Sequence, residues 1–166
     1  MKRLNLGCGK VIKEGWINVD IQKGRGIDKS FDFNKFPYPF ENNVFDEVLI
    51  DNVLEHLQEP QKVMKEIWRI SKKNATIRVI VPYYNTWWAW GDITHVHYFN
   101  ENSIKQVLGE VDYIHDKQKE NFEITKMKAV PQRYLRFMPP QVLNIMKRLF
   151  GNIIIQLDVE AKIIKN

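Results

Sequence analysis

Hydrophobic residues in this chain occur in short runs. Polar turns separate some of these runs, and amphipathic segments separate others. The first run, Leu4 to Leu6, leads into two glycines, and further strands are expected at 15–21, 27–33, 45–50, 75–81 and 122–130. The run 75–81 is rich in β-branched residues, which is typical of a strand buried on both faces. From 153 to 163, apolar residues alternate with mostly polar neighbours, the period of a strand with one buried face.

Three other segments have helical spacing. Pro60 is expected to open the first helix, and Lys72 to Asn74 to end it with cations and a left-handed cap. The second spans about 101–108 after the N-cap residue Asn100, and the third follows Pro139-Pro140. This order predicts an α/β fold: a Rossmann-like, mostly parallel sheet with helices on both faces and an antiparallel C-terminal strand pair.

The chain of 166 residues is expected to be a single domain, 1–166, with a helical lid-like insertion at about 131–151. The link between the first two predicted strands is unusually short. Residues 10–14 are too few for a normal crossover helix between parallel strands, so this connection is expected to be compressed to about one helical turn.

Composition and charge add little to this picture. The formal net charge of +5 is spread among acidic residues, which favours a solvated surface over a block for an anionic partner. Cys8 is the one cysteine, which excludes an intrachain disulfide framework and a cysteine-based zinc site. The N-terminus leads directly into a strand without an apolar run, so a cytoplasmic location is expected.

The first candidate ligand-binding feature along the chain is the glycine turn. A glycine without a Cβ accepts positive φ and lets a ligand lie against backbone N–H groups. In a parallel sheet such a turn lies at the carboxyl end of a strand, where nucleotide-like ligands bind. Asp20 and Asp32 each end a later strand; if either stood alone, a strand-end turn former would be the favoured interpretation.

Taken together, four motifs resemble class I S-adenosylmethionine-dependent methyltransferases, of the kind called methyltransferase type 11. The matching residues are Leu4-Asn5-Leu6-Gly7-Cys8-Gly9, Gly15-Trp16-Ile17-Asn18-Val19-Asp20, Phe45-Asp46-Glu47-Val48 and Asn52-Val53-Leu54-Glu55-His56-Leu57. The resemblance covers about residues 4–108. It implies S-adenosylmethionine as cofactor and methyl transfer as reaction.

The resemblance also implies roles around the first strands. Gly7, Cys8 and Gly9 would pass under the methionine and ribose parts of the cofactor. Asp20 would accept hydrogen bonds from the ribose hydroxyls, because a carboxylate can accept two from a vicinal diol. Ile21 would pack on the adenine.

Further cofactor contacts follow along the sheet edge. Asp32 would accept from the adenine amino group, with Phe33 beside the ring, and Asp51 and Asn52 would face the amino acid end. Asn5 stands where the family commonly has an acid. It could still hold the turn by hydrogen bonding, but a contact to the cofactor ammonium would lose its charge.

Candidate catalytic residues lie just after the strand 75–81. We predict His95 or His97 as a general base with Asp92 orienting it, or else a histidine that braces the helix start. These three residues could also form a metal site, but no further ligand is evident, so no metal is predicted. His56 is expected to brace the turn that follows the strand 45–50.

Two observations count against nucleic-acid base methylation. The turn at Asp51-Asn52 lacks the Asn/Asp-Pro-Pro-aromatic pattern of nitrogen methylases, and the one cysteine lies in the cofactor turn rather than at a nucleophile position. The resemblance to the family implies a small-molecule or saccharide-like acceptor.

Two surface segments have several interpretations. Trp87, Trp88 and Trp90 could fill space under a lid or form a wall for the acceptor. The segment 134–150 carries Arg and Lys around apolar residues, and could be a lid, a homodimer contact or a peripheral membrane contact.

Two other functions remain as alternatives. Two departures from the family pattern, Asn5 in place of the common acid and Lys10 or Val11 in place of a third glycine, leave open a non-catalytic cofactor-binding or scaffold protein of the same fold. A dinucleotide-dependent oxidoreductase is disfavoured, because its fingerprint has a third glycine and an acid about twenty residues further on.

Overall fold

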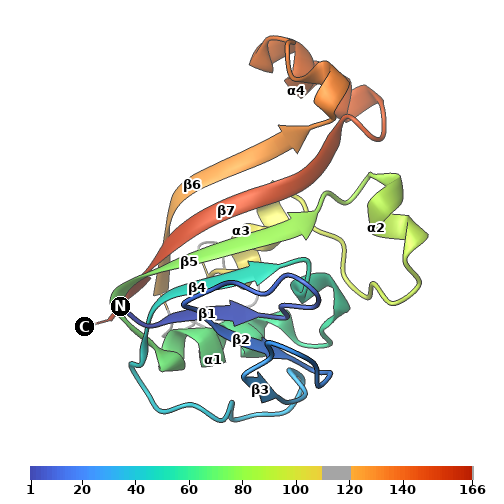
Figure 1. The fold of residues 1–166 in the computed structure, drawn as a ribbon. Coiled ribbons are helices and arrows are strands. Elements are labelled where there is room, and N and C mark those ends of the chain that lie inside the picture. The colour runs from blue at the N-terminus through green and yellow to red at the C-terminus, as the bar shows by residue number, and fades with distance from the viewer. Residues whose placement is uncertain (110–120, 166) are drawn as a thin grey trace.

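The computed structural model describes residues 1–109 and 121–165. These residues form one seven-stranded sheet in the order β3-β2-β1-β4-β5-β7-β6 (Figure 1). Its strands are β1 Arg3–Leu6, β2 Ile17–Asp20, β3 Lys29–Ser30, β4 Phe45–Asp51, β5 Ser71–Pro82, β6 Asn121–Pro131 and β7 Ile154–Ile164.

Strands β1 to β5 pair in parallel, and β7 is antiparallel to both β5 and β6. The expected mostly parallel sheet with an antiparallel C-terminal pair is therefore confirmed. In Figure 1 the long strands β6 and β7 run past the ends of the parallel strands and carry a helix at their far end.

The helical elements in the described ranges are the 3-10 turns η1 Leu54–His56 and η2 Arg133–Leu135 and the α-helices α1 Pro60–Ile70, α2 Trp87–Gly91, α3 Glu101–Val107 and α4 Pro140–Leu149. Pro60 stands at the first position of α1 and Asn100 caps α3, both as expected. None of the helices in the described ranges is long and apolar enough to cross a membrane.

Helices cover one face of the sheet in the part of the chain that the structure describes. α1 and α3 contact each other, and their apolar residues join one buried cluster with Leu4, Leu6, Val48 and Ile77. The alternate strand positions on the other face include paired polar residues, such as Arg78 with Glu160. The expectation of helices on both faces thus holds for one face only, because the links after β1 and β2 are too short to form crossover helices.

Several local predictions need correction. Lys72 to Asn74 do not cap α1: the helix ends at Ile70 and β5 begins at Ser71, with Asn74 at φ +64° inside the strand. The expected strand 27–33 is paired only at Lys29–Ser30, and the link 10–14 forms turns rather than a helical turn. The stretch around Trp87, expected to be a loop, contains the short helix α2.

The segment between β6 and β7 is helical, as the sequence predicted for about 131–151. It comprises η2 and α4, and none of the α4 residues is buried. Its function as a lid remains a prediction.

Candidate functional site

The turn after β1 leaves backbone uncovered at the carboxyl edge of the sheet. Gly7 and Gly9 have φ values of +70° and +50°, and the N–H groups of Gly7 and Cys8 both donate to the Val19 carbonyl at 2.9 Å. A Cβ at Gly7 would lie 2.3 Å from Cγ2 of Val53, whereas one at Gly9 would meet open space. Packing therefore requires the first glycine, and the second leaves room for a ligand.

Asp20 is held beside this turn. Its Oδ2 accepts a hydrogen bond from the Gly9 N–H at 2.8 Å, and its Oδ1 accepts from the Gln22 N–H at 3.0 Å. Each carboxylate oxygen has a further lone pair, so the group can still accept from a ligand hydroxyl. The tips of β1 and β2 thus present a fixed carboxylate next to open backbone.

Asn5 lies inside the protein, with 3% of its surface exposed. Its side-chain amide donates to the Val11 carbonyl at 2.9 Å and to Oδ1 of Asn18 at 3.0 Å. Asn18 also accepts from the Lys13 N–H at 2.9 Å. These bonds fix the short link between β1 and β2, so Asn5 holds the turn; its contact with a cofactor remains a prediction.

Cys8 is buried in the same turn. Burial, and secondly the negative charge of Asp20, raise the pKa of its thiol. The thiol is therefore neutral at physiological pH and unsuited to act as a nucleophile.

The residues predicted to hold the adenine differ in exposure. The side chain of Ile21 is 60% exposed, whereas Phe33 is 5% exposed and packs edge-on against Phe31. Oδ1 of Asp32 accepts from the Asn34 N–H at 2.9 Å. Ile21 is thus open to a planar ligand, while the Phe33 ring belongs to the core.

Asp51 and Asn52 follow at the carboxyl end of β4. Nδ2 of Asn52 donates to Oδ1 of Asp51 at 2.8 Å, and Asn52 has φ +52°. Burial raises the pKa of the Asp51 carboxyl, against the opposing effect of the Arg78 charge. Asn52 also lines the cavity described next, so it links this edge of the sheet to that cavity.

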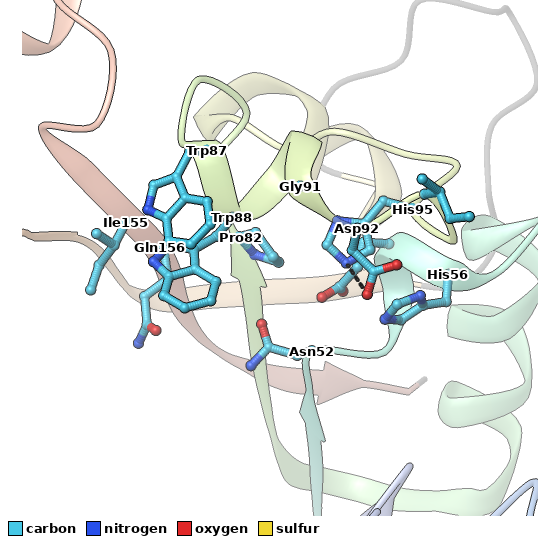
Figure 2. A pocket seen from close by; sticks show the side chains of 12 residues that line it. Asn52, His56, Pro82, Trp87, Trp88, Gly91, Asp92, His95, Ile155 and Gln156 are labelled. Atoms are coloured by element: carbon cyan, nitrogen blue, oxygen red, sulfur yellow. Dashed lines mark ion pairs between the residues drawn. The ribbon is translucent and has the colours of Figure 1, made fainter.

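A cavity of about 830 Å³ lies beyond Asn52, between η1, α2 and the start of β7. Figure 2 shows its two ends: Trp87, Trp88 and Ile155 on one side, and His56 and His95 on the other. The apolar end suits a hydrophobic or ring-shaped surface of a ligand, and the side chains at the polar end can accept or donate a proton. The volume of this cavity lies within the range of small-molecule sites.

Of the predicted catalytic residues, His95 and Asp92 line this cavity. Nδ1 of His95 lies 2.8 Å from the Ala89 carbonyl, and its Nε2 lies 3.9 Å from Oδ2 of Asp92. His97 instead places Nε2 3.2 Å from the Gln58 carbonyl, outside the lining. The structure thus brings two of the three candidates together.

His56, expected only to brace a turn, also lines the cavity. Its ring centroid lies 4.6 Å from that of His95, and its Nδ1 lies 2.9 Å from Oγ1 of Thr94. Burial, and secondly the neighbouring His95, lower the pKa of His56. His56 is therefore a neutral imidazole at pH 7.

Sequence reasoning missed Glu55. This side chain is 1% exposed, and neither carboxyl oxygen has a hydrogen-bond partner among the described residues. Burial raises its pKa to about 8. The available signal was an acid between the apolar residues Leu54 and Leu57 directly after a strand tip.

Exposed apolar side chains lie on the surface beside the cavity. Trp87 and Trp88 are each more than half exposed, and Ile145 and Leu149 on α4 are 61% and 69% exposed. The Trp87 N–H donates to Oδ1 of Asn152 at 2.7 Å, which ties α2 to the segment after α4. Lid, homodimer and peripheral membrane roles for 134–150 all remain predictions.

The fold is similar to that of solved S-adenosylmethionine-dependent methyltransferases. Residues 17–79 match the family model described as a methyltransferase domain. The family resemblance stated from the sequence motifs is thereby confirmed.

Solved structures have a similar fold over nearly the whole of this chain. A SAM-dependent methyltransferase from Archaeoglobus fulgidus is 17% identical, with a TM-score of 0.63 and coverage of 97% of this chain and 86% of that one. The YcgJ protein from Bacillus subtilis is 11% identical, with a TM-score of 0.65 and coverage of 99% and 92%.

A third similar structure carries a different description. The [4+2]-cyclase SpnF is 15% identical, with a TM-score of 0.65 and coverage of 99% of this chain and 76% of that one. No curated protein matches the chain. Because one fold supports different chemistries, the reaction has to be argued from the site.

Proposed function

We propose that this chain binds S-adenosylmethionine across the glycine turn and transfers its methyl group to a small-molecule or saccharide-like acceptor in the adjacent cavity. The observation that carries the proposal is the continuity of the site. The open backbone at Gly9 and the fixed carboxylate of Asp20 lie on the same edge of the sheet as the cavity, which begins at Asn52.

The residues at this edge of the sheet have the chemistry to bind the ribose, the adenine and the amino acid end of the cofactor. Asp20 would accept from the ribose hydroxyls, the exposed Ile21 would pack against the adenine, and Asp51 and Asn52 would meet the amino acid end. When bound, S-adenosylmethionine supplies an electrophilic methyl group on a sulfonium. The protein then has mainly to align a nucleophile with that group, and orientation supplies much of the rate.

A hydroxyl acceptor would also have to lose a proton. His95 is the predicted base that faces the cavity, and because its Nδ1 bonds to a carbonyl, Nε2 is left to accept. We expect His95→Gln to lower turnover by about 10²–10⁴-fold with S-adenosylmethionine affinity unchanged. His97→Gln is the matched control, and an equal loss in that variant would contradict the assignment.

Isothermal titration calorimetry on the purified chain tests the proposal directly. We expect one site for S-adenosylmethionine and one for S-adenosylhomocysteine, with no heat from NAD. Binding of NAD alone would favour the oxidoreductase, and binding of none of the three would favour a scaffold. Binding of both sulfur nucleosides without methyl transfer to any supplied hydroxyl or saccharide acceptor would contradict the transfer step.

The proposal includes a cytoplasmic location, supported by the single, free cysteine Cys8. Nucleic acid is not expected as a partner, because the charges are interspersed and the motif of nitrogen methylases is lacking at Asp51-Asn52.

A further inference from the structure

Three side chains at the polar end of the cavity come close enough to share a metal ion. Glu55, His56 and His95 each offer one ligand atom, and these atoms lie within 4.8 Å of one another. Two of the residues belong to η1 and the third follows α2, so only the folded chain brings them together. Imidazole nitrogen and carboxylate oxygen are common ligands of divalent transition metals.

The proton on His95 is fixed by its backbone contact. A carbonyl can only accept, so the Nδ1 that lies 2.8 Å from the Ala89 carbonyl carries the hydrogen. Nε2 therefore has a free lone pair. Histidines that bind metals usually donate their other ring N–H in this way.

The proton on His56 is fixed by a relay of two hydrogen bonds. The Thr94 hydroxyl donates its one hydrogen to Oδ1 of Asp92 at 2.6 Å. Its oxygen can then only accept from His56, whose Nδ1 lies 2.9 Å away. Nε2 of His56 is thus the second nitrogen with a free lone pair, and Figure 2 shows the His56 and His95 side chains next to each other.

The environment of Glu55 is a separate observation in favour of a bound cation. Its carboxyl is 1% exposed, lines the cavity, and has no hydrogen-bond partner on either oxygen among the described residues. An unpartnered buried carboxyl is costly, and such groups are rare in folded proteins without a compensating ligand. A bound cation would compensate it.

We infer that Glu55, His56 and His95 bind one divalent transition-metal ion at the edge of the cavity, with Zn²⁺ as the best-matched occupant. Around a tetrahedral ion the ligand atoms would be roughly 3.4 Å apart, so the three side chains would close slightly on binding. Three protein ligands leave a coordination position open toward the acceptor. In the ion-bound protein, His95 is a metal ligand and its lone pair is not available to accept a proton. His95 can therefore act as a general base only in the ion-free protein.

The test uses tag-free protein, freed of metal with EDTA and then dialysed, without S-adenosylmethionine. We expect one Zn²⁺ per chain by calorimetry, and a visible ligand-field spectrum with Co²⁺ that Zn²⁺ abolishes. Glu55→Gln, His56→Gln and His95→Gln should each weaken binding at least about 100-fold, because each removes a direct ligand. His97→Gln, a histidine of the same segment outside the cluster, should leave binding unchanged.

A second pair of variants tests the relay without touching a ligand. Thr94 is exposed, so its replacement should not disturb the core. Thr94→Val should weaken Zn²⁺ binding by about 10–100-fold, and Thr94→Ser, which keeps the hydroxyl, should restore it. Wild-type protein that binds no ion, or ion binding that persists in all three ligand variants, overturns the inference.

The outcome is separable from that of the proposed function. S-adenosylmethionine binding in EDTA without any metal binding would overturn only the metal site. Metal binding without S-adenosylmethionine binding would overturn only the cofactor assignment.

Discussion

Gly7→Ala is expected to lower the free energy of unfolding by about 2–5 kcal/mol. A non-glycine residue at φ +70° costs about 1–2 kcal/mol, and overpacking against Val53 adds about 1–3 kcal/mol. Val53 is buried and joins the core cluster, so it cannot turn away from a new Cβ at 2.3 Å. Urea denaturation followed by circular dichroism measures the change.

Gly9→Ala is the matched control within the same turn. Its Cβ would enter open space, so only the positive φ is penalised and the loss of stability should be about 1–2 kcal/mol. That open space is where we place the cofactor, so S-adenosylmethionine affinity should fall at least about tenfold. Equal destabilisation by the two variants, or unchanged affinity in Gly9→Ala, would contradict this division of roles.

Asp20→Asn is expected to weaken S-adenosylmethionine binding by about 10–100-fold. The substitution removes one charge-assisted hydrogen bond to the ribose, which is worth about 1.5–3 kcal/mol. The amide oxygen of Asn can still accept from the Gly9 N–H, but its NH2 group cannot accept from the Gln22 N–H, so the free energy of unfolding should fall by about 0.5–1.5 kcal/mol. Calorimetry gives the affinity, and thermal unfolding gives the stability.

Asp28→Asn is the control for this variant. Asp28 also accepts from a backbone N–H, that of Asn18 at 2.7 Å, but this contact is at the other end of β2 from the glycine turn. It should leave S-adenosylmethionine affinity unchanged. A parallel loss of affinity in both variants would mean that the carboxylates act through the fold and not on the ribose.

The apolar runs and the glycine turn were enough to predict the sheet and its antiparallel end. They failed where a local signal competed with tertiary pairing. Asn74 is a good left-handed cap, but pairing of Ser71 with Phe45 extends β5 back to the end of α1. Helices on both faces were predicted from the alternation of strands and helices along the chain, and the short links after β1 and β2 could not supply them.

The sequence likewise predicted only some of the residues of the candidate site. Gly7, Gly9 and Asp20 could be found from the sequence, because consecutive strand tips of a parallel sheet meet at one edge whatever the details of packing. Glu55, His56 and His95 could not be recognised as a group, since 39 positions separate His56 from His95 and ordinary spacing rules do not reach that far.

By itself, then, the sequence determined the class of fold and the position of the nucleotide edge, because strand periodicity and glycine turns are local properties of the chain. The tertiary structure alone decided which acid is buried without a partner and which histidine nitrogens are free. The free nitrogen of His56, for example, depends on the Thr94 hydroxyl, which is 38 positions away along the chain and reaches η1 only after folding.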